Sequence, residues 1–259
     1  MTLSADDLQA LARAKQQLEQ PGLAARIGHF VGAPIERGLK ALPGPVSGIV
    51  TTATEKAVSK ALQIAVTSLG SRTGGTAREG WHKLAAGAAG AAGGAFGFAA
   101  LAAELPISTA IMLRSIAAIA RSEGEDLADP AVRMACVQVL ALGGPGKADD
   151  ASEAGYFTSR AALAQAVQAA ARHLAQRKAA DSGAPVMVAF AAQVAARFSI
   201  PVSEKVMAQA VPVVGAVGGA ALNTLFIDHF QTIAHGHFTV RRLERRHGEA
   251  AVREAYERL

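Results

Sequence analysis

The stretch LAAGAAGAAGGAFGFAALAA, residues 84–103, contains no charged side chain and consists mostly of alanine and glycine. Four of its glycines recur at steps of three and four residues: Gly87, Gly90, Gly94 and Gly97. On a helix they share one face, which has no side chains, so another backbone can approach that face directly. Twenty such residues can cross a hydrocarbon core of about 30 Å. We nevertheless favour a buried core helix, because so few large apolar side chains make membrane insertion weak.

A second uncharged stretch, VMAQAVPVVGAVGGAALNTLFI at residues 206–227, repeats this glycine pattern. Its Gly215 and Gly219 occupy the positions in GAVGG that Gly90 and Gly94 occupy in GAAGG. Charges lie just outside both stretches. We therefore predict two central, glycine-faced helices, about 84–103 and 206–227, that pack against each other.

The composition agrees with a helical protein. The 259 residues include 60 alanines and 26 glycines, and only 5% are aromatic. Charged residues make up 18%, below the roughly 25% usual in soluble proteins. These proportions exclude a disordered tail, a disulfide scaffold and an aromatic-rich sandwich, and they predict an all-α, compact multi-helix bundle.

Cysteine usage and charge limit the cellular context and the partners. Cys136 is the single cysteine, and its apolar neighbours predict a buried thiol in a reducing cytoplasm. The N-terminus shows no Sec-type leader. A net charge of +5 without a polybasic run argues against a nucleic acid partner but can assist binding to an anionic membrane surface.

Local signals predict where the helices begin and end. Glycines between residues 70 and 75 predict a hinge between an N-terminal helical region, residues 1–75, and a main helical domain, residues 76–259. Ser4 and Asp7 form a capping-box pattern at the first helix. Further helices are expected at about 46–69, 106–120, 130–141, 150–177 and 183–198, and from the second glycine stretch to about 247, where Gly248 ends the helix.

Charged groups beside the first glycine stretch are candidates for function or for ion pairing. Glu104 precedes Leu105-Pro106, and we expect a hairpin in which Arg114 or Arg121 neutralises it. Glu123 and Asp126 belong to a run of carboxylates that can bind a cation or supply acid/base chemistry. We interpret this run as a solvated turn at which Gly124 ends the helix.

Two later segments are rich in polar residues. Glu153, Tyr156 and Arg160 form a stripe in which Glu153 is expected to contact one of the other two, although the stripe can also grip a polar head group. In 228–238, His237 falls on the apolar face and is expected to be buried and hydrogen-bonded. The alternative is a zinc site made from Asp228, His235 and His237.

The candidate residues can be grouped by role. The expected ligand or lipid contacts are Arg114, Arg121, Tyr156, Arg160, Arg241 and Arg242. If the protein is an enzyme, the candidate catalytic groups are Glu123, Asp126, Glu153, Tyr156 and His237. The chain contains no GxSxG elbow, no P-loop and no HExxH pair, so no standard reaction is indicated.

Three blocks carry a family resemblance: GGAFGFAALAAELPISTAIMLRSIAAIARSEGEDLADP (93–130), DDASEAGYF (149–157) and RFSIPVSEKVMAQAVPVVGAVGGAALNTLFIDHFQTIAHGHFTVRRLERRHG (197–248). In this order they resemble the bacterial EcsC protein family, over roughly residues 80–250. The family is named after the third member of an operon that also encodes an ABC transporter. The resemblance therefore implies a link to that transporter, to secretion or to envelope physiology, and it supplies no catalytic residues.

We accordingly expect a cytoplasmic, non-enzymatic protein without a cofactor that associates peripherally with the inner membrane or holds a lipid-like ligand. One alternative is a metal-assisted hydrolase that uses Asp228, His235 and His237 with nearby carboxylates. Another is an interaction module that docks on an ABC-transporter subunit.

Overall fold

A computed structural model of the chain describes residues 3–19, 22–31, 44–70, 98–144, 155–176, 181–209 and 219–259. Within these ranges the secondary structure is helical and contains no strand. The helices are α1 (Ala5–Leu18), α2 (Leu23–Val31), α4 (Gly44–Thr67), α6 (Phe98–Ser122), α7 (Pro130–Leu142), α8 (Gly155–Gln176), α9 (Pro185–Gln209), α11 (Gly219–His247) and α12 (Glu249–Arg258). The prediction of an all-α multi-helix bundle is confirmed.

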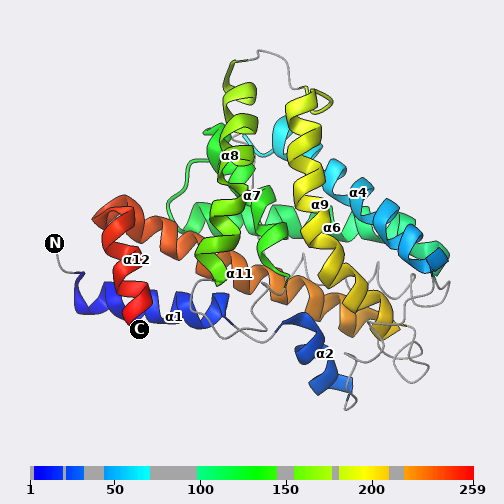
Figure 1. Cartoon of the computed structure of the whole chain (residues 1–259), viewed down its shortest axis with the longest axis horizontal. Coiled ribbons are helices and arrows are strands. Elements are labelled where there is room, and N and C mark those ends of the chain that lie inside the picture. The colour runs from blue at the N-terminus through cyan, green and yellow to red at the C-terminus, as the bar shows by residue number, and fades with distance from the viewer. Residues whose placement is uncertain are drawn as a thin grey trace.

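The longest helix, α11, is the centre of the bundle. It contacts α1, α2, α6, α7, α9 and α12. In Figure 1 it crosses the molecule from side to side, with α7, α8 and α9 above it and α1 and α2 below. The first and last helices lie together at one end, where Lys15 Nζ donates to the carbonyl oxygen of Tyr256 at 3.1 Å.

Helix ends follow the local signals in the sequence. The Ser4 hydroxyl accepts from Asp7 N at 3.1 Å and caps α1, and the Asp129 carboxylate accepts from Ala131 N at 2.8 Å and caps α7. Gly124, at φ +78°, ends α6, and Gly248, at φ +88°, separates α11 from α12. These boundaries were all expected from the sequence.

Two prolines expected near helix boundaries lie inside helices instead. α6 continues through Pro106, and α9 continues through Pro201. An interior proline costs about 3 kcal/mol. Leu105, Phe198 and Val202 lie next to these prolines or within one turn of them and are fully buried, and burial of each contributes about 1.5–3 kcal/mol. Tertiary packing therefore outweighs the local proline signal, and the expected hairpin at Glu104 does not form.

The predicted glycine crossing falls largely outside the described residues. Gly87, Gly90, Gly94, Gly97 and Gly215 all lie there, while Gly219 begins α11. The described ends of the second uncharged stretch belong to two helices, with 206–209 in α9 and 219–227 in α11. The crossing of the two glycine faces therefore stays a prediction.

A close helix crossing that the structure does describe is at another glycine, Gly236. A Cβ atom added there would lie 3.0 Å from the carbonyl oxygen of Ala14 and 2.7 Å from Leu18 Cγ. The absence of a side chain at Gly236 thus lets α1 lie directly on α11.

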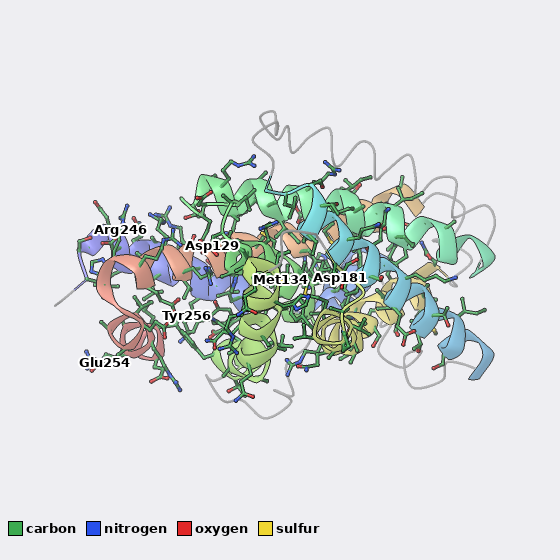
Figure 2. All side chains as sticks on the ribbon, turned by 90° about the horizontal axis from the view of Figure 1, so that it is seen from above. Asp129, Met134, Asp181, Arg246, Glu254 and Tyr256 are labelled. Carbon is green, nitrogen blue, oxygen red and sulfur yellow. The ribbon has the colours of Figure 1, made fainter. Side chains whose placement is uncertain are left out.

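The larger hydrophobic core joins α4 to α6, α7, α9 and α11. In Figure 2, α4 crosses over α6. The buried side chains of α4, such as Val58 and Leu62, therefore share a core with helices beyond the predicted hinge at 70–75. Only residue 70 of the predicted hinge is described, so the domain boundary stays a prediction.

Cys136 is buried as expected, and burial raises the pKa of its thiol to about 12.

Candidate functional site

A fully buried ion pair lies where α6, α9 and α11 meet. Lys205 Nζ donates to both carboxylate oxygens of Glu104, at 2.9 and 3.1 Å, and to Asn223 Oδ1 at 2.9 Å. The ammonium group also lies 4.9 Å from the centre of the Phe226 ring. Burial lowers the pKa of Lys205, while the Glu104 carboxylate acts in the opposite direction. We call Lys205, Glu104 and Asn223 the inner cluster.

The inner cluster corrects the predicted pairing of Glu104 with Arg114 or Arg121. Both arginines are exposed on α6. Because α6 continues through Pro106, ten residues of helix separate Glu104 from Arg114, a distance of about 15 Å along the axis. The partner of Glu104 comes instead from α9.

Farther along α11, His237 is buried against α8. Tyr156 Oη lies 2.8 Å from His237 Nδ1, within hydrogen-bonding distance. Burial, together with the nearby guanidinium groups of Arg241 and Arg160, holds the pKa of His237 well below its usual value, so the ring is neutral. Burial also raises the pKa of Tyr156 to about 12. This contact confirms the expectation of a buried, hydrogen-bonded histidine.

Arg160 lies on α8, one turn after Tyr156, and its side chain contacts α11. Its Nη1 and Nη2 donate to the two carboxylate oxygens of Glu244 at 2.7 and 2.8 Å. The sequence predicted that Glu153 contacts either Arg160 or Tyr156; residue 153 lies outside the described ranges, so that contact stays a prediction. The bidentate pair joins α8 to α11.

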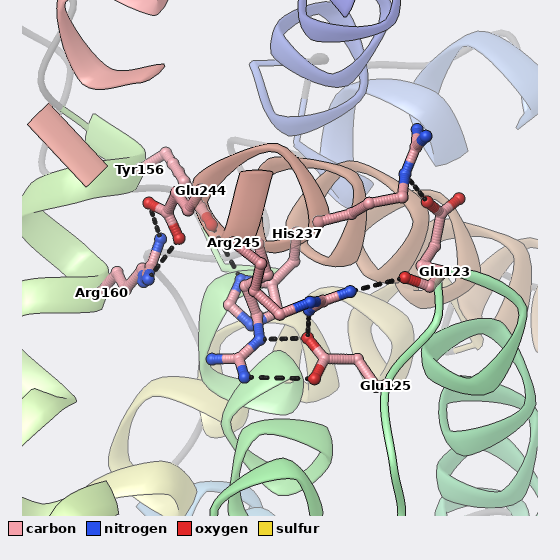
Figure 3. Close-up of polar contacts among 9 residues, drawn as sticks. Glu123, Glu125, Tyr156, Arg160, His237, Glu244 and Arg245 are labelled. Atoms are coloured by element: carbon pink, nitrogen blue, oxygen red, sulfur yellow. Dashed lines mark hydrogen bonds and ion pairs between the residues drawn. The ribbon is translucent and has the colours of Figure 1, made fainter. Parts of the chain in front are cut away.

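The acidic turn after α6 inserts a carboxylate between arginines of α11 (Figure 3). Glu125, whose side chain is 4% exposed, accepts from Arg241 Nε at 2.7 Å and from Arg245 Nη1 at 2.5 Å. Beside it, Arg242 forms an ion pair with Glu123 at 2.7 Å. We call Glu125 with Arg241 and Arg245 the outer cluster. The expectation of a solvated turn thus holds for the helix end at Gly124 but is wrong for Glu125.

The other described residues of the expected metal and acid/base sites each have a different partner and do not form one site. Asp126 is exposed and accepts from Ala128 N at 2.9 Å. Asp228 pairs with Arg26 of α2 at 2.7 Å, and His237 contacts Tyr156. Among the described residues, no three His, Cys, Asp or Glu side chains come together in a way that could hold a metal ion. The described part of the chain therefore offers the hydrolase hypothesis no metal centre.

Two hollows open beside these clusters. The first, of about 730 Å³, lies between α7, α8, α11 and α12 and is walled by small side chains and by charged groups that include Arg160, Arg241, Arg253, Glu244 and Glu249. We call it the α8–α12 groove. The second, of about 540 Å³, is lined by Ser122, Glu123, Gly124, Arg242, Arg245 and Arg246. We call it the arginine pocket.

A third feature is the outer face of α9. α6, over residues 103–122, and α9 are both long and apolar enough to cross a membrane, but 61% of the α6 window is buried and only 39% of the α9 window. The outer face of α9 exposes mostly apolar side chains and one amide: Val188, Ala189, Ala192, Gln193, Ala196 and Ile200. With the adjacent outer face of α8, we call it the α8–α9 surface.

Comparison with known proteins identifies the family. The model of the EcsC protein family matches residues 5–243. The chain belongs to the EcsC family. The EcsC match begins in α1, so it extends farther toward the N-terminus than the sequence blocks that carried the resemblance. No curated protein and no solved structure was found to match the chain.

Some central polar residues of this EcsC protein were not singled out from its sequence. Lys205 is one, and its signal was its place immediately before the second uncharged stretch, as Glu104 immediately follows the first. His229 is another; its Nε2–H donates to the carbonyl oxygen of Gly143 at 2.6 Å, and burial lowers its pKa to about 4. No local pattern identifies the partner of either side chain.

Proposed function

We propose that this EcsC protein associates peripherally with the anionic surface of the inner membrane through its α8–α9 surface, in a non-enzymatic role in transport, secretion or envelope physiology. The observation that supports the proposal is the outer face of α9, which is largely apolar and carries no charged side chain from Pro185 to Ala196. It agrees with the expectation from the sequence that exposed apolar helix faces meet the membrane.

The outer face of a surface helix normally carries charged side chains. α4, which packs beside α9, follows this rule and exposes Glu55, Lys56 and Lys60. By contrast, α9 has no charged residue from Pro185 to Ala196, and Val188 is 53% exposed. An exposed apolar stripe of this kind favours a contact with something other than water.

The charges around the stripe favour an anionic partner. α8 and α9 together contain one carboxylate, Glu204, and it is buried. Arg172 is exposed on α8, and Arg197 is half-buried on α9. Apolar side chains flanked by cations without exposed carboxylates are typical of helices that lie in the membrane interface.

The magnitudes support peripheral binding rather than a membrane span. Val188 and Ile200 are 53% and 40% exposed, so burial of their remaining surface in the interface contributes about 1 kcal/mol each, and each nearby arginine about 1 kcal/mol. A span by α9 would instead carry Lys205 away from Glu104 and expose a charge to lipid, which costs several kcal/mol. Reversible surface association leaves the inner cluster intact.

Liposome co-sedimentation tests the proposal. The purified protein is expected to sediment with vesicles that contain anionic lipid and less with neutral vesicles. Val188→Asp should weaken binding about tenfold or more, because it removes apolar burial and adds a charge of the wrong sign. Ile107→Asp is the matched control, because Ile107 is equally exposed, at 53%, but lies on α6.

The outcomes separate the proposal from its alternatives. The proposal is contradicted if the protein binds neither anionic nor neutral vesicles. It is also contradicted if Val188→Asp and Ile107→Asp weaken vesicle binding equally. Sedimentation only with vesicles that carry a transporter would favour the interaction module over lipid binding.

A further inference from the structure

We infer that the arginine pocket binds a phosphate monoester group. The pocket lies at the end of α11, next to the turn that follows α6, and has a volume of about 540 Å³. This inference does not depend on the α8–α9 surface, which lies on other helices.

The cations of the pocket come from neighbouring positions on one helix. Arg242, Arg245 and Arg246 stand three and four residues apart on α11, so their side chains leave the helix on the same side. Their side chains are 29%, 40% and 57% exposed, respectively. A ligand can therefore reach all three guanidinium groups.

The guanidinium groups are oriented before any ligand arrives. Arg242 pairs with Glu123 at 2.7 Å, and Arg246 lies 3.6 Å from Asp7. Arg245 donates to Glu125 at 2.5 Å and to the carbonyl oxygen of Glu123 at 2.7 Å. Since a guanidinium has five N–H donors, these contacts leave several for a ligand, and they reduce the side-chain entropy lost on binding.

Gly124 leaves the approach to Arg245 open. The nearest atom to a Cβ added at Gly124 would be Arg245 Nη2, at 3.6 Å. Any side chain at this position would extend from that Cβ beside the guanidinium group. Glycine thus serves two purposes here, because its φ of +78° also ends α6.

Access to its arginines favours the arginine pocket over the α8–α12 groove as an anion site, because Arg160 and Arg241 of the groove are only 19% and 24% exposed. The pocket lining contains three arginines and one carboxylate, Glu123. Glu125 and Asp7 contact Arg245 and Arg246 from outside the lining, and the three arginine side chains remain 29–57% exposed. The groove lining contains three arginines and two carboxylates, and one of these arginines, Arg160, is held bidentately by Glu244. In the pocket, the guanidinium N–H donors that remain open to solvent can meet the oxygens of a phosphate monoester, which carries close to two negative charges near neutral pH.

The pocket can hold a phosphate with a small polar substituent, and this chemistry has two sources. One is a soluble phosphate monoester, and the other is the head group of phosphatidic acid at a membrane surface. Arginine suits both, because its planar donors match phosphate oxygens.

Calorimetric titration of the full chain with inorganic phosphate and with glycerol phosphate tests the inference. Both probes are expected to bind, and Arg246→Gln should weaken binding about tenfold. The fold should tolerate this change, because Arg246 is exposed and its pair with Asp7 is long. Arg258→Gln, which removes a still more exposed, ion-paired arginine of α12, should leave binding unchanged.

A vesicle experiment distinguishes the two sources. If the protein binds vesicles with phosphatidic acid more tightly than vesicles with phosphatidylglycerol, and Arg246→Gln loses this preference, the inference is supported and the ligand is a lipid head group. Binding of glycerol phosphate without that preference supports it with a soluble source. No binding in either experiment, or equal loss in Arg258→Gln, overturns it. Val188→Asp should affect sedimentation with all anionic vesicles but not the titration, so failure of this inference and failure of the membrane proposal are separable.

Discussion

The inner and outer clusters each pair a basic side chain with a glutamate and each include a residue of the central helix, α11, but they differ in their access to solvent. Lys205 is completely buried, and all its described polar contacts are with Glu104 and Asn223. Arg245 of the outer cluster is 40% exposed, although its partner Glu125 is buried. The inner cluster therefore can only hold helices together, whereas the outer one also presents donors to a ligand.

The physical difference between the clusters is the desolvation of the positive charge. Removing an ammonium group from water costs several kcal/mol, and the buried pair offsets this cost only while both partners are present. The arginines of the outer cluster keep part of their hydration, so a change of partner costs less. This contrast gives an ordered set of predictions.

The largest effect is expected from breaking the inner cluster. Lys205→Met leaves the Glu104 carboxylate buried without its cation, and the free energy of unfolding should fall by about 3–5 kcal/mol. Urea denaturation measures the change. The double variant Lys205→Met with Glu104→Gln should recover part of the loss, and a single variant as stable as the wild type would contradict the structural role of the pair.

Acid should destabilise the region between the two clusters. His229 has a folded pKa of about 4, below its unfolded value near 6.5, so the unfolded chain binds more protons between these values. Its contribution is fully present above pH 6.5 and is lost as the pH falls toward 4, at about 1.4 kcal/mol per pH unit. His237 acts in the same direction. Thermal unfolding across this range should show the slope, and His229→Asn should reduce it.

Loss of the outer carboxylate should have a smaller effect than loss of Lys205. Glu125→Gln removes charge-assisted hydrogen bonds from Arg241 and Arg245, which remain partly hydrated, and we expect a loss of about 1–2 kcal/mol in urea denaturation. A loss as large as that of Lys205→Met would show that the two clusters are equivalent after all.

The smallest effect is expected at exposed pairs of α12. Arg253→Gln and Arg258→Gln each break an exposed pair four residues apart on the helix, and each should change stability by less than about 0.5 kcal/mol. Denaturation by urea again provides the measurement. A larger change at Arg253 would instead point to its contact with the Phe157 ring, at 5.7 Å.

Particular residues show how far the sequence could predict the candidate site. Burial of His237 followed from helical periodicity, because the apolar stripe of one helix is a local property. The partner of Glu104 did not follow, since Lys205 lies 101 positions away. Likewise, Arg160 could be placed on a polar stripe, but its partner, Glu244, is 84 positions distant. From the expected residues, the structure brings together Tyr156, Arg160, His237 and Arg241, and it places Arg242 in the separate arginine pocket. It leaves Arg114 and Arg121 exposed on α6.

The sequence by itself determined the all-α class, the family, and the helix ends at Ser4, Gly124, Asp129 and Gly248, because backbone conformation and capping depend on residues a few positions apart. Tertiary structure alone decided that α6 and α9 continue through their prolines and that Glu125 becomes buried. Those outcomes depend on burial and on ion pairs between distant segments, whose free energies exceed the local preferences only once the helices are packed.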